Sequence, residues 1–216
     1  MSGGSKNSRY YYSVGALEDV GYSINSNFKR YSTRLNIDFN PLSWLEAKTN
    51  IGYSYATSNQ NGQSSDSGSI FWTTANMPSI YPLFERDADG EKMNDVYGGY
   101  KYDYGINRGF AGLTNSIADA NYNTSRSLIH NLNLNQSLSI TLSDDLKYET
   151  NLAYSYTMSN GDFRSDPFYG SSRGQGGYIS KSKSQAISWI LRNALRYTKE
   201  INDDLDIDSY IAYESE

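Results

Sequence analysis

Aromatic side chains gather in one stretch of this chain, where they could bind a ligand or anchor a partner protein. The stretch covers residues 60–123 and is too aromatic for a plain disordered linker. Aromatic faces stack on sugar rings and bury well in protein interfaces. We predict binding by at least one of these side chains, against the alternative that they only pack the loop or form an aromatic girdle. The candidates are Phe71, Trp72, Tyr81, Tyr100, Tyr102 and Tyr104.

The sequence predicts no catalytic residue, no metal site and no cofactor, so we do not expect an enzyme. The single histidine, His130, has no neighbour that fits catalysis or metal binding. The absence of cysteine excludes disulfides, thiolate metal sites and thiol catalysis. Residues 87–91 (DADGE) contain only the opening fragment of a calcium loop, and we interpret them as a tight turn. A net charge of −5 without a basic block argues against nucleic acid as a partner.

Outside that stretch, apolar and polar residues alternate by twos, which is the pattern of strands with two unlike faces. The clearest case is residues 29–58, where two alternating runs flank the turn formed by Asn40, Pro41, Leu42 and Ser43. This pattern predicts an antiparallel hairpin, and later segments repeat it. The predicted strands cover residues 10–17, 29–40, 45–59, 125–142, 146–159, 178–199 and 205–214, with an eighth if residues 1–4 end another strand.

The connections between these strands alternate in length. Residues 18–28, 60–123 and 160–177 form long loops, whereas residues 40–44, 143–145 and 202–204 form short turns. In an up-and-down meander every second connection lies at the same end, so short turns and long loops fall at opposite ends. Several strands exceed the roughly 9–11 residues that span a membrane. This pattern is typical of an outer-membrane β-barrel. The fold class predicted is therefore all-β, an antiparallel meander of seven or eight strands within a large transmembrane barrel.

The barrel interpretation assigns a role to each face of the strands. Carboxylates such as Glu149, Asp206 and Asp208 alternate along the polar face and are expected in a hydrated lumen wall rather than in an acid–base pair. On the apolar face, His130 interrupts the pattern and is interpreted as an interface residue. The residues predicted to face lipid are Tyr31, Leu35, Ile37, Phe39, Ile51, Tyr53, Leu132, Leu134, Leu152, Tyr154, Trp189 and Leu191.

Two stretches of the sequence resemble the barrel of SusC-like (RagA-like) TonB-dependent transporters, which are outer-membrane nutrient importers of Bacteroidota. They are SGGSKNSRYYYSVGAL at residues 2–17 and NSNFKRYSTRLNIDFNPLSWLEAKTNIGYSYA at residues 25–56. The most specific block is FKRYSTRLN, followed by the turn and Trp44-Leu45. The phrases IYPLF, DADG, YDYG and PFYG in the loops, and the Ser-rich strand up to Trp189, are similar to that family too.

The resemblance implies import of oligosaccharides or peptides through a 22-stranded barrel that is closed by a plug and driven through TonB. It also implies a SusD-like surface lipoprotein as a lid on the long loops, and outer-membrane lipid around the barrel. The sequence shows no signal peptide, plug, TonB box or final strand, so we expect an internal barrel fragment. Two alternatives stay open: a passive outer-membrane channel or structural barrel, and a soluble carbohydrate-binding β-sandwich.

Overall fold

Eight antiparallel strands form one sheet in which spatial order follows chain order, within the residues that the computed structural model describes, 1–60, 69–202 and 204–216. The predicted all-β up-and-down meander is therefore confirmed, with residues 2–4 supplying the eighth strand. The strands are β1 (Ser2–Gly4), β2 (Ser8–Val20), β3 (Asn27–Leu42), β4 (Leu45–Asn59), β5 (Thr124–Thr141), β6 (Leu146–Ser165), β7 (Tyr178–Asn202) and β8 (Leu205–Ser215).

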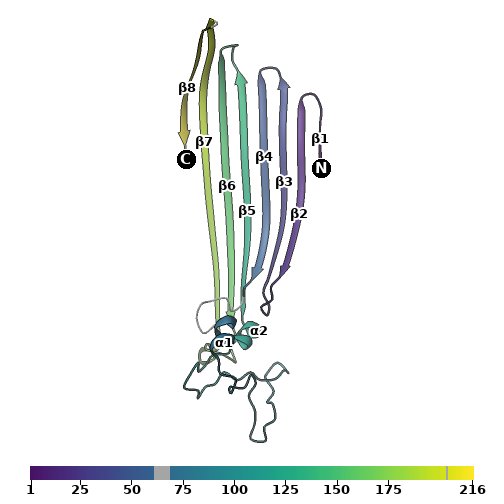
Figure 1. Cartoon of the computed structure of the whole chain (residues 1–216), viewed down its shortest axis with the longest axis vertical. Coiled ribbons are helices and arrows are strands. Elements are labelled where there is room, and N and C mark those ends of the chain that lie inside the picture. Colours follow the sequence, from purple (N-terminus) through teal and green to yellow (C-terminus); the bar gives the residue numbers. More distant parts are fainter. Residues whose placement is uncertain (61–68, 203) are drawn as a thin grey trace.

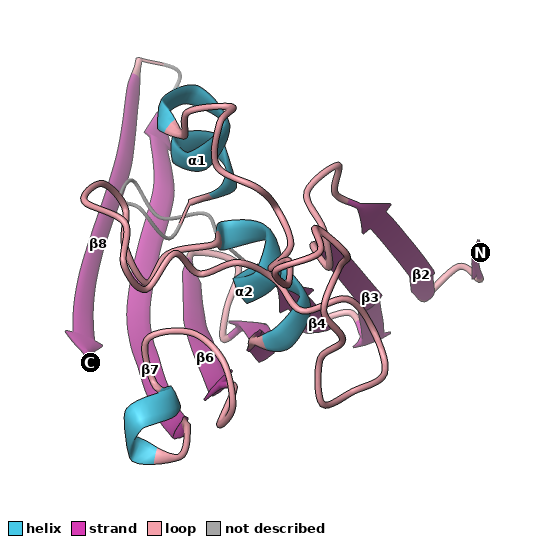
Figure 2. Ribbon diagram, turned by 90° about the horizontal axis from the view of Figure 1, so that it is seen from below, coloured by secondary structure: helices cyan, strands magenta, loops and turns pink. Residues whose placement is uncertain are grey.

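Figure 1 shows the strands side by side, with the turns β3–β4 and β5–β6 at one end and the long connections at the other. The long connections carry α1 (Ile70–Asn76), α2 (Ser116–Tyr122) and the short 3-10 helix η1 (Arg173–Gln175). Figure 2 shows from below that these helices and loops lie over the ends of the strands. Among the described residues, no helix is both long enough and apolar enough to cross a membrane.

Two of the predicted loops are shorter than expected. Strand β6 continues through residues 160–165, which pair with β7 from Asn160 opposite Lys183 to Ser165 opposite Tyr178. The first long loop shrinks to residues 21–26, because β2 runs to Val20 and β3 begins at Asn27. Asn, Gly, Asp and Ser have low strand propensity, but a continuous ladder of hydrogen bonds to a long neighbour overrides it.

The register between strands brings the apolar positions into phase across the sheet. Leu35 lies opposite Ile51, Ile51 opposite Leu134, and Leu134 opposite Tyr154, which faces Trp189. A slip of one residue between any two strands would move the apolar side chains of one of them to the opposite face of the sheet. All twelve residues predicted to face lipid therefore share one face of the sheet, which we call the apolar face. The opposite face, with Asn133, Ser155 and their neighbours, is called the polar face.

Three pairs of polar groups that interrupt the apolar face form hydrogen bonds between adjacent strands. The Thr49 hydroxyl donates to Oε1 of Gln136 at 2.6 Å, and these residues are register neighbours. The Tyr53 hydroxyl lies 2.8 Å from Nδ1 of His130, and the Tyr148 hydroxyl donates to Oδ1 of Asn193 at 2.8 Å. A polar group without water needs an internal hydrogen-bond partner. The interruptions of the apolar pattern are thus compatible with a dry environment on that face.

Candidate functional site

The long connections fold together into one unit, which we call the loop assembly, made of residues 69–123 and 166–177. Its interior holds Tyr104, Ala118 and Tyr169, which are 5%, 0% and 8% exposed. Asn115 caps α2 by accepting from the Ala118 N–H at 3.0 Å, and its own amide donates to the Asp103 carbonyl at 3.0 Å. The cap therefore fixes α2 against the extended segments that precede it.

Two carboxylates organise the loop assembly, and one of them, Asp166, joins its two connections. Asp166, which is 2% exposed, accepts from the Tyr97 hydroxyl at 2.5 Å and from the N–H groups of Phe168 and Tyr169 at 2.8 and 3.0 Å. Asp95 accepts from the N–H groups of Tyr97 and Gly99 at 2.9 and 2.7 Å and from the Tyr122 hydroxyl. Charge-assisted hydrogen bonds of this kind are stronger than neutral ones. The long connections at this end of the sheet therefore have a defined structure that side-chain hydrogen bonds stabilise.

Sequence reasoning missed Tyr97, Tyr122 and Tyr169, which join this network. A local signal for the first existed in residues 95–99 (DVYGG), because Asp followed by glycines favours a turn capped by its own side chain. The contacts of Tyr122 with Asp95 and of Tyr97 with Asp166 span 27 and 69 residues of sequence, so no local pattern encodes them.

Burial and these partners shift several pKa values in the loop assembly. The hydrogen bond to Asp166 raises the pKa of Tyr97 to about 12. Burial raises the pKa of the Tyr104 hydroxyl and of the Asp119 carboxyl, and the two groups are joined by a 3.0 Å hydrogen bond. Partial burial alone would raise the pKa of Asp95, but hydrogen bonds from Tyr122, Gly99 and Tyr97 hold it below its usual value. The tyrosines are thus donors at neutral pH.

Asp119→Asn is expected to stabilise the loop assembly at pH 7, by on the order of 1 kcal/mol, which is the size of one net hydrogen bond. The raised pKa of Asp119 means that its contribution is full below the ordinary carboxyl pKa and is lost as pH rises through the folded value. Asn keeps an acceptor at Oδ1 for Tyr104 and Asn123 without the buried charge. Amide hydrogen exchange at residues 115–123, measured at pH 7, checks the sign.

The acid sensitivity of the Asp119→Asn variant, compared with that of the wild type, provides a second test. The lowered pKa of Asp95 means that its contribution is full above the ordinary value of 3.8 and is lost as pH falls through the folded value. In the wild type the two carboxyls act in opposite directions as pH falls. Asp119→Asn removes the compensating group, so its loop assembly should loosen more steeply in acid than the wild type. Equal acid sensitivity of the two proteins would contradict the assignment.

Five of the six predicted binding aromatics fall into two groups. Near α1, Trp72 stacks on Phe110 at 5.8 Å, Tyr81 lies 4.9 Å from the Arg108 guanidinium, and Phe71 is 46% exposed. In the extended part of the loop, Tyr100 is 51% exposed and its ring lies 4.6 Å from Lys92 Nζ. Tyr102 packs against Phe84 and Tyr122.

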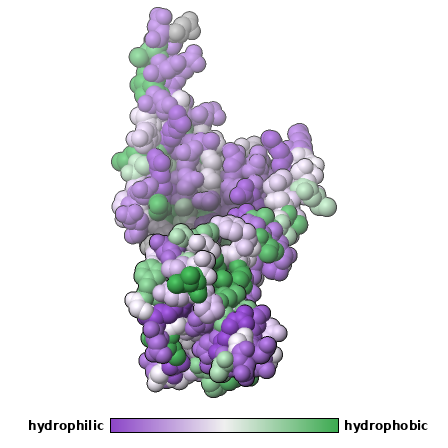
Figure 3. Space-filling view, turned by 60° about the horizontal axis from the view of Figure 1, so that its bottom comes forward, coloured by the Kyte–Doolittle hydropathy of each residue, from purple (hydrophilic) through white to green (hydrophobic). Residues whose placement is uncertain are grey.

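Tyr104 differs from the other five, because it lies in the interior of the loop assembly and donates to Asp119. The structure instead leaves other apolar side chains open to solvent on the loop assembly, and Figure 3 shows hydrophobic patches over this end of the molecule. These include Ile80, Val96, Tyr97, Phe110, Leu113 and Phe168.

Residues 87–91 form a turn. Oδ1 of Asp87 accepts from the N–H groups of Asp89 and Glu91 at 3.0 and 2.9 Å, and Gly90 adopts a φ of 85°. This oxygen therefore serves the backbone of the turn, and Gly supplies the left-handed conformation that it requires.

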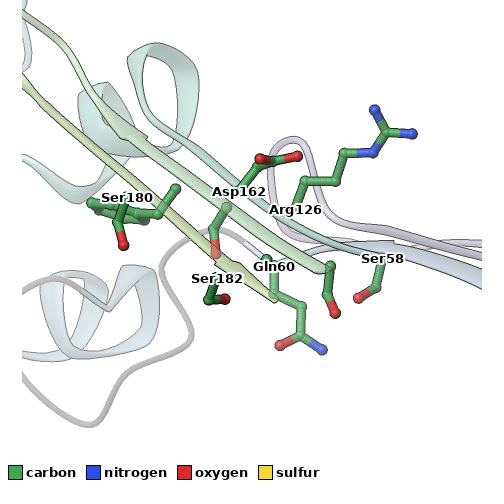
Figure 4. Close-up of a pocket in the computed structure, with 10 residues that line it drawn as sticks. Ser58, Gln60, Arg126, Asp162, Ser180 and Ser182 are labelled. Atoms are coloured by element: carbon green, nitrogen blue, oxygen red, sulfur yellow. The ribbon is translucent and has the colours of Figure 1, made fainter. Parts of the chain in front are cut away.

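A hollow of about 200 Å³ opens on the polar face where the strands meet the long connections. We call it the serine pocket. A Cβ at Gly161 would lie 2.6 Å from Oγ of Ser182, so a larger residue there would push into its lining. Figure 4 shows Ser58, Gln60 and Ser182 on one side of the strands and Arg126 and Asp162 on the other. The hydroxyls come from Ser58, Ser125, Ser127, Ser180 and Ser182.

The serine pocket can donate and accept hydrogen bonds through its hydroxyls and the Gln60 amide. The single histidine, His130, lies on the apolar face and partners Tyr53. A set of hydroxyls that both donate and accept suits a polar ligand with alternating donors and acceptors. The arrangement is therefore suited to contact with such a ligand.

Comparisons with known proteins identify solved structures with a similar fold. No protein-family model matches the chain, and no curated protein matches it. A chain of the RagAB peptide transporter is similar to it, with a TM-score of 0.74 and 24% sequence identity over 99% of this chain. Chains of the RagAB peptide importer in its "closed-closed" and "open-open" states give TM-scores of 0.73 and 0.71 at the same identity. This chain spans 23% of the length of each, so it has the fold of one part of them.

Proposed function

We propose that this chain forms part of the wall and outer loops of a SusC-like, TonB-dependent importer barrel in the outer membrane. The observation that carries the proposal is the register that brings the apolar positions of β3 to β7 onto one face. The sorting of turns and long connections to opposite ends and the similarity to the RagAB transporter support it. Further strands would pair with the edges at β1 and β8.

In this proposal the apolar face contacts lipid and the polar face lines the lumen. The central rows of the polar face are rich in side-chain amides, for example Asn50 opposite Asn135 and Asn36 opposite Asn50. Amides and the hydroxyls of the serine pocket match the alternating donors and acceptors of peptides and of oligosaccharides. Peptides are the first choice of substrate, because the similar solved structure is that of a peptide transporter.

The loop assembly is proposed to meet the substrate or a SusD-like surface lipoprotein that acts as a lid. Phe71 and Tyr100 are about half exposed, and exposed aromatic side chains anchor interfaces at little entropic cost. The carboxylate network around Asp95 and Asp166 fixes the backbone of residues 97–99, directly before Tyr100. A preformed surface loses less free energy on binding than a mobile one.

Uptake by cells tests this function. The complete protein of which the chain is a proposed part, here called the parent protein, is expected to support uptake of labelled oligopeptides too large for porins, and removal of TonB should abolish uptake. Uptake that persists without TonB would favour a passive channel. Uptake of oligosaccharides but not peptides would overturn the substrate choice. Recovery of the parent protein in the soluble fraction would favour the carbohydrate-binding β-sandwich.

The double variant Phe71→Ala/Tyr100→Ala is expected to weaken lid binding or substrate uptake about tenfold. Loss of a half-exposed aromatic contact at an interface costs about 1 kcal/mol or more, and 1.4 kcal/mol is a factor of ten. The matched control is Tyr210→Ala, since Tyr210 is also exposed but lies on β8, away from the loop assembly. Unchanged uptake and lid binding in the double variant would remove both residues from the proposed contact surface.

A further inference from the structure

Cationic side chains border the apolar face at the end where the long connections lie. Register places Lys29 and Lys183 in one row, Arg126 and Lys181 in the next, and Arg164 beyond them. The acidic residues of these rows are Glu18 and Asp162, so cations outnumber anions five to two within the described strands. We call this border the basic rim. It lies between the apolar face and the loop assembly.

The basic rim contains a pocket of about 390 Å³. Lys181 is 78% exposed at its side chain and lies 3.8 Å from Asp162, so much of its ammonium remains open to a ligand. Arg126 and Lys183 are also exposed. Figure 4 shows Arg126 on the side of the strands opposite the labelled serines, away from the serine pocket. The lining is Arg126, Leu128, Asn160, Asp162, Lys181, Ser182 and Lys183.

The chemistry of this pocket points to an anionic headgroup with an apolar continuation. Three cations can neutralise phosphate, and the Asn160 amide can bond sugar hydroxyls. Leu128 begins the apolar side of the pocket, and Leu132 lies further along the same face. At the opposite end of that face, Lys199 is paired with Asp145 at 2.9 Å, so the described strands are not equally basic at both ends. If lysine and arginine side chains only extended towards water at each membrane interface, that asymmetry between the two ends would not be needed.

We propose that the basic rim binds the phosphorylated sugar headgroup of a glycolipid in the outer leaflet, with its acyl chains lying on the apolar face. This rests on the proposed function, because only a barrel whose long connections lie outside presents the rim to that leaflet. Basic clusters that border a membrane-spanning surface attract anionic headgroups. The bound lipid would brace strands β5 to β7 just below the loop assembly.

The test uses the purified parent protein in detergent and counts bound lipid by native mass spectrometry. The probes are bisphosphorylated lipid A, dephosphorylated lipid A with the same acyl chains, and inorganic phosphate. The wild type should retain bisphosphorylated lipid A at least tenfold more tightly than the dephosphorylated form, and millimolar phosphate should not displace it. Arg126→Gln/Lys181→Gln/Lys183→Gln should lose this preference. Lys199→Gln, a cation on the same face at the other end, should keep it.

Each other outcome overturns the proposal. Equal retention of both lipids by the wild type would mean that the apolar face alone holds them. This comparison needs no variant. Displacement by inorganic phosphate would make the pocket a simple anion site. Equal preference in the triple variant and the wild type would place the headgroup elsewhere. Fractionation of the wild type with the outer membrane is measured in parallel, so failure of the lipid proposal is distinguishable from failure of the proposed function.

Discussion

Leu134→Arg is expected to prevent stable insertion of the parent protein into the outer membrane, whereas Asn133→Arg is expected to leave insertion intact. Leu134 lies in the middle of β5 on the apolar face, between Ile51 and Tyr154 on the neighbouring strands. An arginine on the lipid face of a barrel costs about 2–4 kcal/mol at the bilayer midplane and much less in a hydrated lumen. The neighbouring Asn133 lies on the polar face at nearly the same depth, so it is a matched control.

Heat-dependent gel mobility of outer-membrane fractions measures this difference, because a folded barrel migrates differently from the unfolded chain. The account predicts folded Asn133→Arg protein in the membrane and depletion of folded Leu134→Arg protein. If both variants fold equally well, or if Asn133→Arg is the more damaging, the assignment of the apolar face to lipid is wrong.

Asp166→Ala is expected to separate the two long connections that form the loop assembly. The substitution removes the acceptor for the Tyr97 hydroxyl and for the N–H groups of Phe168 and Tyr169. Hydrogen bonds to charged groups contribute about 1.5–3 kcal/mol each, although shared acceptors do not add fully. The expected local loss is therefore several kcal/mol, without effect on the strand ladders. Asp166→Asn should lose less, because Oδ1 still accepts the two N–H groups.

Hydrogen exchange resolved to peptides checks this prediction. Amides in residues 95–99 and 166–177 should exchange at least a hundredfold faster in Asp166→Ala, while those of β5 should not change. Asp206→Ala is the matched control, since Asp206 is an exposed carboxylate on the polar face near the β7–β8 connection. Unchanged exchange in the loops of Asp166→Ala would show that Asp166 does not hold them together.

The sheet could be predicted from sequence because its signal is local. Leu35, Ile37 and Phe39 reveal one face within five consecutive residues, and a period of two is a property of a single strand. The register adds what the pattern of one strand cannot show, namely that Thr49 lies opposite Gln136 and satisfies it. The ends of strands were harder, because residues 160–165 have the composition of a loop and are strand only through pairing with β7.

The loop assembly could be predicted only in part because its contacts are long-range. Tyr has an apolar ring and a polar tip, so its type does not distinguish the buried Tyr104 from the exposed Tyr100. The hydroxyls of the buried Tyr104 and of the half-buried Tyr122 are satisfied by carboxylates that lie elsewhere in the sequence. Asp119 accepts from Tyr104, and Asp95 accepts from Tyr122. The serine pocket was missed for the same reason, since its hydroxyls come from three strands and only the register brings them together.

Site-directed spin labelling along β5 tests the central claim, that the apolar face contacts lipid, most directly. The chain contains no cysteine, so single cysteines at residues 131–138 introduce unique labelling positions within it. Relaxation by oxygen, which partitions into lipid, and by a polar nickel chelate, which stays in water, is measured in the parent protein in membranes. We predict that oxygen dominates at positions 132, 134, 136 and 138 and the nickel chelate at 131, 133, 135 and 137. Loss of this alternation, or its reversal, would contradict the account.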